Sequence, residues 1–148
     1  MKIVHPICCG MDIHKNIIVA TIATTDSKGI TTYEQATFST MNRDVIKLRD
    51  WLVSRNCRLA CMESTGKYWI PIWNILESEI KLTLAHPKYT KAIKGKKTDK
   101  KDSKWIADLF KHDLVPNSFI PPSDIRQLRD LSRYRYKLTY IQVSEKNR

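Results

Sequence analysis

Four carboxylates lie near the ends of predicted structural elements: Asp12, Glu63, Asp99 and Asp102. Asp12 follows a short apolar stretch and Glu63 ends another, while Asp99 and Asp102 are three residues apart and share one helix face. Carboxylates brought close together repel unless a cation lies between them, and Mg²⁺ (or Mn²⁺) prefers oxygen ligands. A pair of such ions can activate a nucleophile and stabilise the leaving oxygen of a phosphodiester. The four acids therefore predict a metal-dependent phosphoryl-transfer site.

Each acid taken alone also has an ordinary structural interpretation. Asp12 is an edge or turn residue in that interpretation, and Glu63 accepts hydrogen bonds in the turn that follows it. Asp99 and Asp102 then cap a helix on a solvated face. His14, two residues after Asp12, is either an exposed strand histidine or a group that supports Asp12. The shared position of all four acids at element ends favours the metal site.

Basic residues surround the last two acids. The stretch 81–111 has ten lysines and three aspartates, and the whole chain has a net charge of +11. A run of lysines is usually a solvated surface, but beside a phosphoryl-transfer site it is suited to phosphate contact. We expect nucleic-acid contacts from Lys67, Lys88, Lys91, Lys94, Lys96, Lys97, Lys100, Lys101 and Lys104.

The elements that must position these residues alternate between β-prone and helical patterns. Residues 7–11, 16–23 and 31–39 are predicted to form a three-stranded meander with a turn at 26–29. Further strands are predicted at 58–62 and 81–85, with helices at 41–55, 69–79, 88–97, 99–111 and 123–148. Thr40 or Asn42, Thr98 and Ser123 are the expected N-caps. This order indicates an α/β fold with a mixed sheet flanked by helices, the order found in ribonuclease H-like proteins.

Length and composition limit the other possibilities. A chain of 148 residues is long enough for one domain with its own core. No apolar run is long enough to cross a membrane, and the N-terminus does not resemble a secretory signal. Cys8, Cys9, Cys57 and Cys61 fit buried thiols better than a zinc site or disulfides. We expect no membrane partner and a cytoplasmic, nucleoid-associated protein.

Three motifs carry a resemblance to a known family. They are the Cys-Gly-Met-Asp-Ile-His-Lys segment at 9–15, Met-Glu-Ser-Thr-Gly-Lys-Tyr-Trp at 62–69 and Lys-Thr-Asp-Lys-Lys-Asp-Ser at 97–103. The chain resembles the N-terminal DEDD domain of the insertion-sequence transposases related to the Piv DNA invertase, the bridge-RNA-guided recombinases. Small departures are Ser103, where the family usually has Ala, and His86, where it usually has Asn.

The resemblance implies a RuvC-like fold and a Mg²⁺ site at Asp12, Glu63, Asp99 and Asp102. It also implies DNA strand cleavage and exchange with a structured guide RNA as partner. It divides the chain into a catalytic domain at 1–115 and a loop with the start of a helical, coiled-coil region at 116–148. The serine-bearing second domain of full-length relatives has no counterpart here, so the isolated chain is expected to bind metal and nucleic acid without completing recombination.

The last predicted helix adds a possible interface. Its apolar stripe contains Ile125, Leu128, Leu131, Leu138 and Ile141 with Tyr134. Such a stripe packs against the chain itself or forms the seam of a homodimer or higher oligomer. Two further hypotheses for function stay open beside the transposase: a Holliday-junction-type nuclease of the same fold, and a non-catalytic nucleic-acid-binding fragment.

Overall fold

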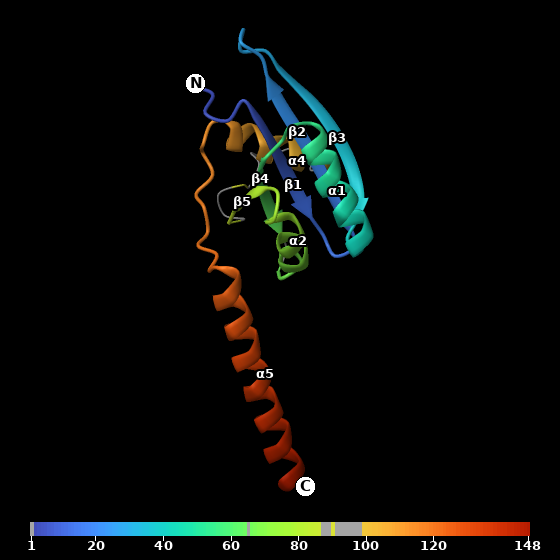
Figure 1. Cartoon of the computed structure of the whole chain (residues 1–148), viewed down its shortest axis with the longest axis vertical. Helices are drawn as coiled ribbons and strands as arrows, with labels where there is room; N and C mark the ends of the chain where they lie inside the picture. The colour runs from blue at the N-terminus through green and yellow to red at the C-terminus, as the bar shows by residue number, and fades with distance from the viewer. Residues whose placement is uncertain (1, 65, 87–89, 91–98) are drawn as a thin grey trace. The chain divides into compact units, whose positions relative to one another are not determined.

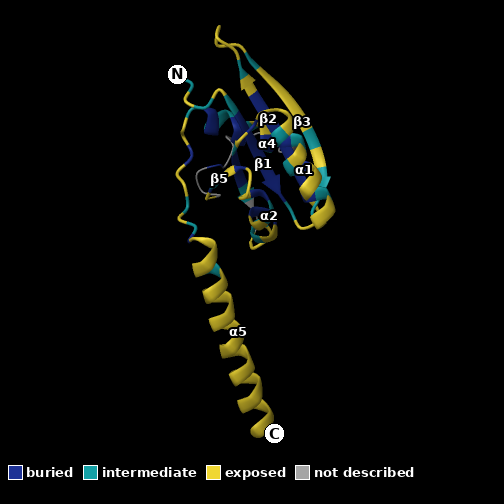
Figure 2. Cartoon of the chain, viewed as in Figure 1, coloured by how far each residue is buried: buried dark blue, intermediate teal, exposed yellow. Residues whose placement is uncertain are grey.

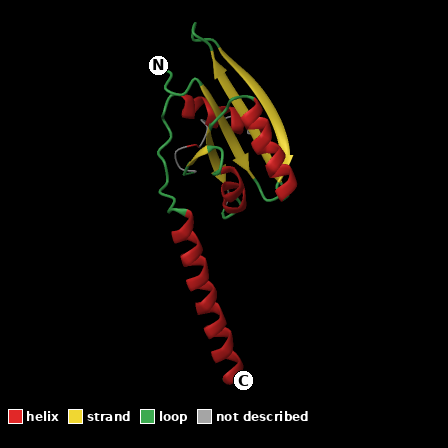
Figure 3. Ribbon diagram, viewed as in Figure 1, coloured by secondary structure: helices red, strands yellow, loops and turns green. Residues whose placement is uncertain are grey.

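The computed structural model describes residues 2–64, 66–86, 90 and 99–148 of the chain. These residues form two compact units, Met1–Ser118 and Phe119–Arg148. The first contains all of the strands and the second contains the last helix (Figure 3). The elements in order are β1 (Ile7–Ile13), β2 (Ile17–Thr25), β3 (Thr31–Ser39), α1 (Asn42–Ser54), β4 (Leu59–Ser64), α2 (Trp69–Leu76), β5 (Lys81–Leu84), α4 (Asp99–Lys111) and α5 (Ser123–Lys146).

The five strands form one mixed sheet in the order β3-β2-β1-β4-β5. The first three strands are an antiparallel meander, and β4 and β5 extend the sheet in parallel to β1. Between β2 and β3, the carboxylate of Asp26 accepts hydrogen bonds from the backbone of Lys28 and Ile30, and Gly29 adopts φ +80°. The predicted meander, its turn and the mixed sheet are confirmed.

Helices α1 and α2 cover one face of the sheet (Figure 1). In α1 the buried residues Val45, Leu48 and Leu52 recur at helical spacing, as the sequence pattern predicts. They share this side with the fully buried Met11 and Met62 of the central strands. The buried residues of α2 are Ile72, Trp73 and Leu76. An apolar core therefore lies between this face of the sheet and the two helices.

Helix α4 covers the opposite face. Its Ile106, Ala107 and Phe110 are buried with Cys8 of β1 and Cys61 of β4. Figure 2 shows the central strands as the buried part of this unit, with exposed residues along β3 and the outer sides of the helices. The unit therefore has three layers, with the sheet in the middle.

Two of the predicted N-caps are wrong. Helix α1 begins after Met41 with no capping side chain; Ser39 instead donates to Asp44 at 2.6 Å, and Thr40 donates to the carbonyl of Lys15. Helix α5 begins after Pro122, so Ser123 is its first helical residue and not its cap. Proline supplies a fixed φ at such a boundary without a side-chain hydrogen bond.

The helix boundaries otherwise follow the predictions closely. Helix α2 ends at Leu76, earlier than the predicted residue 79, because the backbone N–H of Glu79 bonds to the carbonyl of Leu76 in a tighter turn. The start and end of α4 agree with the prediction. The predicted helix at 88–97, and Thr98 as a cap, fall mostly or wholly outside the described residues.

The four cysteines are free and buried, as expected. Burial is the main reason that the pKa of the Cys57 thiol rises to about 11 and that of the Cys8 thiol to about 12. Such thiols are neutral and poorly nucleophilic near pH 7. Among the described residues, no helix is both long and apolar enough to span a membrane.

The second unit consists of a loop and α5. None of the 24 residues of α5 is buried. The side chains of the predicted stripe are all exposed, with Leu128 at 60% and Leu131 at 67%. The stripe is therefore not covered by another segment within this unit.

Candidate metal centre at the ends of β1 and β4

Two of the predicted acids lie side by side in the middle of the sheet. Asp12 of β1 and Glu63 of β4 are register partners in a parallel pair of strands. Neighbouring strands are about 4.8 Å apart, and partners in register point to the same face. Asp12 is only 8% exposed, and Glu63 is half-buried. The expectation that these strands are neighbours is confirmed, and the register places Asp12 opposite Glu63.

His14 contacts one of the two acids. Its Nε2 lies 3.1 Å from Oδ2 of Asp12, within hydrogen-bonding distance. The residue follows the end of β1, where its backbone N–H donates to the carbonyl of Ile17 at 2.9 Å. This turn directs the imidazole back toward the strand end. Of the two interpretations of His14, the geometry favours the one in which it supports Asp12.

The backbone of α4 approaches β1 at Gly10. An added Cβ at Gly10 would lie 2.3 Å from both the carbonyl oxygen of Ser103 and the backbone nitrogen of Ala107. Glycine is therefore required here because a side chain would occupy the space of the helix backbone. Gly10 is two residues before Asp12, so this contact fixes the position of α4 along β1, close to the acid pair.

The direction of α4 follows from two further contacts. The Cys8 Sγ lies 3.7 Å from the carbonyl oxygen of Ala107, and the backbone N–H of Val4 donates to the carbonyl of Lys111 at 2.8 Å. Later residues of α4 thus lie beside earlier residues of the N-terminal segment, so helix and strand run in opposite directions. The N-terminal turns of α4 consequently point toward the Asp12 end of β1.

The two acids of α4 occupy those turns. Asp99 is the first residue of the helix, one turn before Ser103, and Asp102 is partly exposed. The side chain of Asp99 lies outside the described part of the structure. Among the described side chains, no group of three or more His, Cys, Asp or Glu residues is arranged to hold a metal ion. The structure therefore brings Asp12 and Glu63 together and directs the start of α4 toward them.

A buried polar network near Asp102 has no counterpart in the sequence predictions. Ser103 and Thr21 share a hydrogen bond of 2.8 Å, and the amide of Gln35 donates to both hydroxyls at 2.8 and 3.1 Å. Thr21 and Ser103 are 1% and 0% exposed. The network connects β2, β3 and α4. Two sequence signals could have indicated it: Thr21, a polar residue inside the apolar run of β2, and Ser103, where the resembled family usually has Ala.

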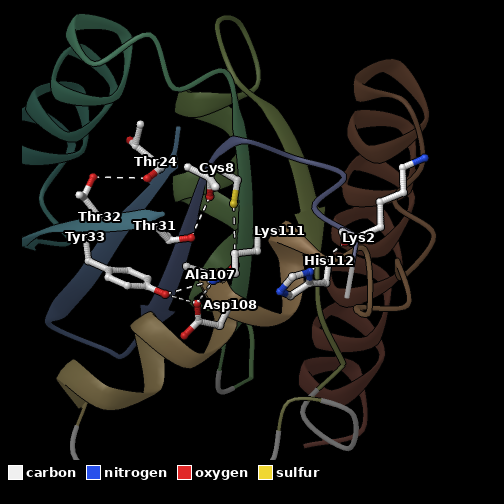
Figure 4. Close-up of polar contacts among 11 residues, drawn as sticks. Lys2, Cys8, Thr24, Thr31, Thr32, Tyr33, Ala107, Asp108, Lys111 and His112 are labelled. Carbon is white, nitrogen blue, oxygen red and sulfur yellow. Dashed lines mark hydrogen bonds and ion pairs between the residues drawn. The ribbon is translucent and has the colours of Figure 1, made fainter. Parts of the chain in front are cut away.

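A second polar cluster fastens the other end of α4 to the edge strand β3 (Figure 4). The hydroxyl of Tyr33 donates to Asp108 at 2.5 Å, and the ammonium of Lys111 lies 2.7 Å from the same carboxylate. Lys111 also donates to the Tyr33 oxygen at 3.1 Å. Burial, together with the carboxylate of Asp108, raises the pKa of Tyr33. Both ends of α4 are therefore held on the sheet by hydrogen bonds.

The predicted phosphate-binding lysines are only partly described. Lys67 is exposed in the turn before α2. The Nζ of Lys104 lies 4.1 Å from the centroid of the Tyr33 ring, which is a cation–π distance. Lys100 and Lys101 belong to α4, but their side chains, and all of Lys88, Lys91, Lys94, Lys96 and Lys97, lie outside the described residues.

The donor chemistry at the acid pair fits a hard divalent cation. Two carboxylates in strand register present oxygen atoms on one face, and Mg²⁺ takes one or two carboxylates together with water and substrate phosphates. The cysteine thiols are poor competitors for the cation, because they are buried and because burial raises the pKa values of Cys8 and Cys57. The residues present thus suit Mg²⁺ or Mn²⁺ better than zinc.

Comparison with solved structures identifies the fold as RuvC-like. The match to the structure of Thermus thermophilus RuvC covers 76% of this chain and 99% of that chain, with a TM-score of 0.55 and 10% identity. The same enzyme in complex with a Holliday junction substrate gives a TM-score of 0.51 at 6% identity, with the same coverage. The predicted ribonuclease H-like fold is confirmed. A search of the curated proteins returned no match.

The sequence itself gives a more specific assignment. The profile of the transposase family DEDD_Tnp_IS110 matches residues 9–148. The chain belongs to this family of transposases. The resemblance inferred from its three motifs is confirmed.

Proposed function

We propose that this chain is the catalytic domain that cleaves and exchanges DNA strands in an insertion-sequence transposase, with Asp12, Glu63, Asp99 and Asp102 as its Mg²⁺ ligands. The observation that carries the proposal is the strand register of Asp12 with Glu63 beneath the start of α4. Buried or half-buried carboxylates in register are costly unless a cation neutralises them. A structural role for the two acids would not require that arrangement.

Each residue has a distinct part in this proposal. Asp12 and Glu63 hold the cation from the sheet, and His14 orients the Asp12 carboxylate through its 3.1 Å contact. Asp102 and Asp99 complete the ligand set from α4. Bound Mg²⁺ would lower the pKa of a water or hydroxyl nucleophile and stabilise the leaving oxygen of the phosphodiester. Lys67, Lys104 and the other predicted lysines neutralise the DNA backbone as it approaches.

The partners follow from the same assignment. The substrate is DNA, and we propose the structured guide RNA implied by the family resemblance as a second partner, with the complete protein working at the nucleoid. The exposed apolar stripe of α5 is proposed as a homodimer or oligomer seam, since Leu128, Leu131 and Leu138 are exposed at helical spacing. Sedimentation of Leu131→Asp beside the unchanged chain tests that seam: the unchanged chain should self-associate and the variant should not.

The test of activity is cleavage of labelled DNA with Mg²⁺. We expect the chain to nick branched or transposon-end DNA, and Asp12→Asn and Glu63→Gln each to lower the rate at least 100-fold without loss of folding. Asp50→Asn, on the exposed side of α1, is the matched control and should keep the rate. Equal rates in all variants would exclude the acid pair from the reaction.

A junction-resolving nuclease is the second candidate, because the fold matches that of RuvC. The same assay separates the two functions. Cleavage restricted to four-way junctions, with no action on transposon ends and no strand joining, would favour the nuclease. Binding of DNA that is indifferent to Mg²⁺ and to Glu63→Gln, without any cleavage, would instead favour a non-catalytic fragment.

A further inference from the structure

Helix α5 has a second face, distinct from its apolar stripe. Six basic residues and three acidic residues lie along the helix. Residues three or four positions apart share a helix face, and this spacing connects a set of four cations and two tyrosines, with Asp130 at its flank. We call this set the basic stripe; it consists of Arg126, Arg129, Arg133, Tyr136, Lys137 and Tyr140.

Three cations of the basic stripe, Arg129, Arg133 and Lys137, are available to a ligand. Among the residues that the structure describes, no carboxylate pairs with Arg129, Arg133 or Lys137. These three lie at four-residue intervals, about 6 Å apart along the helix axis. Arg126 differs, since its guanidinium donates to the carbonyl of Pro121 at 2.8 Å and so fixes the start of the stripe. A row of exposed cations with no carboxylate paired to them is complementary to a phosphate backbone.

The tyrosines of the stripe indicate what kind of nucleic acid it suits. Tyr136 and Tyr140 are 73% and 68% exposed and are one turn apart beside Lys137. Large exposed aromatic side chains among cations provide surfaces on which unpaired bases stack. In a duplex the bases already stack on each other, so a duplex would use only the cations. The combination therefore fits a single strand better than a double helix.

We propose that the basic stripe of α5 binds single-stranded DNA, as a contact separate from the acid pair. Phosphates would contact Arg129, Arg133 and Lys137, and bases would stack on Tyr136 and Tyr140. The choice of DNA rests on the proposed function, because strand cleavage and exchange must expose unpaired DNA. The apolar stripe lies on other positions of α5, so self-association and DNA binding can occur on the same helix.

Two double variants of the full chain make a matched test. Arg133→Gln with Lys137→Gln removes two charges from the stripe, and Arg135→Gln with Lys146→Gln removes one Arg and one Lys from α5 outside it. Glutamine is a good helix former, so both variants keep the helix, which circular dichroism checks. Fluorescence anisotropy with a labelled 20-nucleotide DNA strand, in EDTA over a range of salt concentrations, gives the affinity and its salt dependence.

We expect the stripe variant to bind about tenfold more weakly, and its slope of log affinity against log salt to fall in magnitude by about 1.4, since each single-strand contact contributes about 0.7. The variant outside the stripe should stay within twofold of the unchanged chain. Tyr136→Leu with Tyr140→Leu should weaken binding about tenfold and leave the slope unchanged. Equal losses in the two charge variants would overturn the proposal, as would no loss in the tyrosine variant.

Competitors complete the test. A duplex of the same sequence that binds as tightly as the single strand would overturn the proposal, and so would an RNA strand that binds tenfold more tightly than DNA. Because EDTA removes divalent metal, binding here does not depend on the acid pair. If Asp12→Asn loses cleavage but binds the single strand normally, the basic stripe is supported as a separate contact. If the chain cleaves DNA but its basic stripe does not bind the single strand, the stripe proposal is contradicted and the proposed function is not.

Discussion

The two faces of the sheet hold their helices in different ways. On the α1 and α2 face, fully buried apolar side chains such as Leu48 and Ile72 pack against the sheet. The polar contacts of α1 with the sheet are at the exposed edge, where Trp51 and Arg55 donate to Glu34 of β3. On the α4 face, a backbone contact at Gly10, the Thr21–Gln35–Ser103 network and the Tyr33–Asp108–Lys111 cluster fix the helix. Apolar packing is non-directional, whereas hydrogen bonds and close contacts specify position. The helix on the face that carries the acids is the one positioned by a buried polar network and by a close backbone contact.

The largest loss of stability is expected on the apolar face. Leu48→Ala leaves a cavity under α1 and should lower the free energy of unfolding by about 2–5 kcal/mol, measured by urea denaturation. Since α4 is untouched, the folded fraction should keep its Mn²⁺ affinity. Ile46→Ala, at a 40% exposed position of the same helix, should cost less than about 0.5 kcal/mol. A change in Mn²⁺ affinity in Leu48→Ala would mean that the two faces are not separable.

Gly10→Ala should affect stability less and the site more. Its Cβ would lie 2.3 Å from two backbone atoms of α4, so the helix must move, at a cost of about 1–3 kcal/mol. We expect Mn²⁺ affinity to fall at least tenfold, as measured by calorimetry. Gly29→Ala also strains the backbone, at φ +80°, but has no atom within 4 Å; it should leave Mn²⁺ affinity unchanged. Equal effects of the two variants on affinity would refute a positioning role for the Gly10 contact.

Ser103→Ala should have a smaller effect again. It removes the hydrogen bonds to Thr21 and Gln35 but leaves those two bonded to each other at 2.8 Å, so we expect a loss of about 1 kcal/mol. Ser54→Ala, which removes an exposed hydroxyl from α1, is the control and should be nearly neutral. A loss in Ser103→Ala no larger than in the control would show that the network adds nothing to the position of α4.

Ionisation of the buried thiols should leave the free energy of unfolding unchanged at neutral pH and should lower it in alkali. The pKa of Cys57 is about 11 in the folded chain against an ordinary value of 9.0, so its contribution to stability is complete below pH 9 and is lost as the pH rises toward 11. We expect the free energy of unfolding to fall by up to about 1.4 kcal/mol per pH unit for each such thiol. Cys57→Ala should reduce the slope by the share of one thiol; an unchanged slope would show that this thiol ionises equally in both states.

Sequence periodicity predicts most of the helices and strands of the fold. The apolar spacing of α1, the β-branched runs of the meander and the acidic first turn of α4 are local patterns with a direct physical cause. The strand register that joins Asp12 to Glu63 could be anticipated only as a consequence of β1 and β4 being neighbours. Such pairing over some fifty residues depends on the packing of the whole sheet.

The supporting contacts of the site could not be predicted. Gln35 reaches Ser103 across 68 positions of sequence, and Tyr33 reaches Asp108 across 75. Nothing in their local sequence distinguishes them from exposed strand residues. Thr40 does not cap α1 for a related reason, since its hydroxyl donates to the carbonyl of Lys15, a partner that local propensity does not reveal.

The central claim is that Asp12 and Glu63 hold a divalent cation together. The most direct measurement is a Mn²⁺ titration of the chain followed by electron paramagnetic resonance, with Asp12→Asn, Glu63→Gln and the control Asp50→Asn compared at equal concentration. We predict that each of the first two variants binds Mn²⁺ at least tenfold more weakly than the unchanged chain and that the control binds equally well. Equal Mn²⁺ binding in all four proteins, or none in the unchanged chain at millimolar metal, would contradict the account.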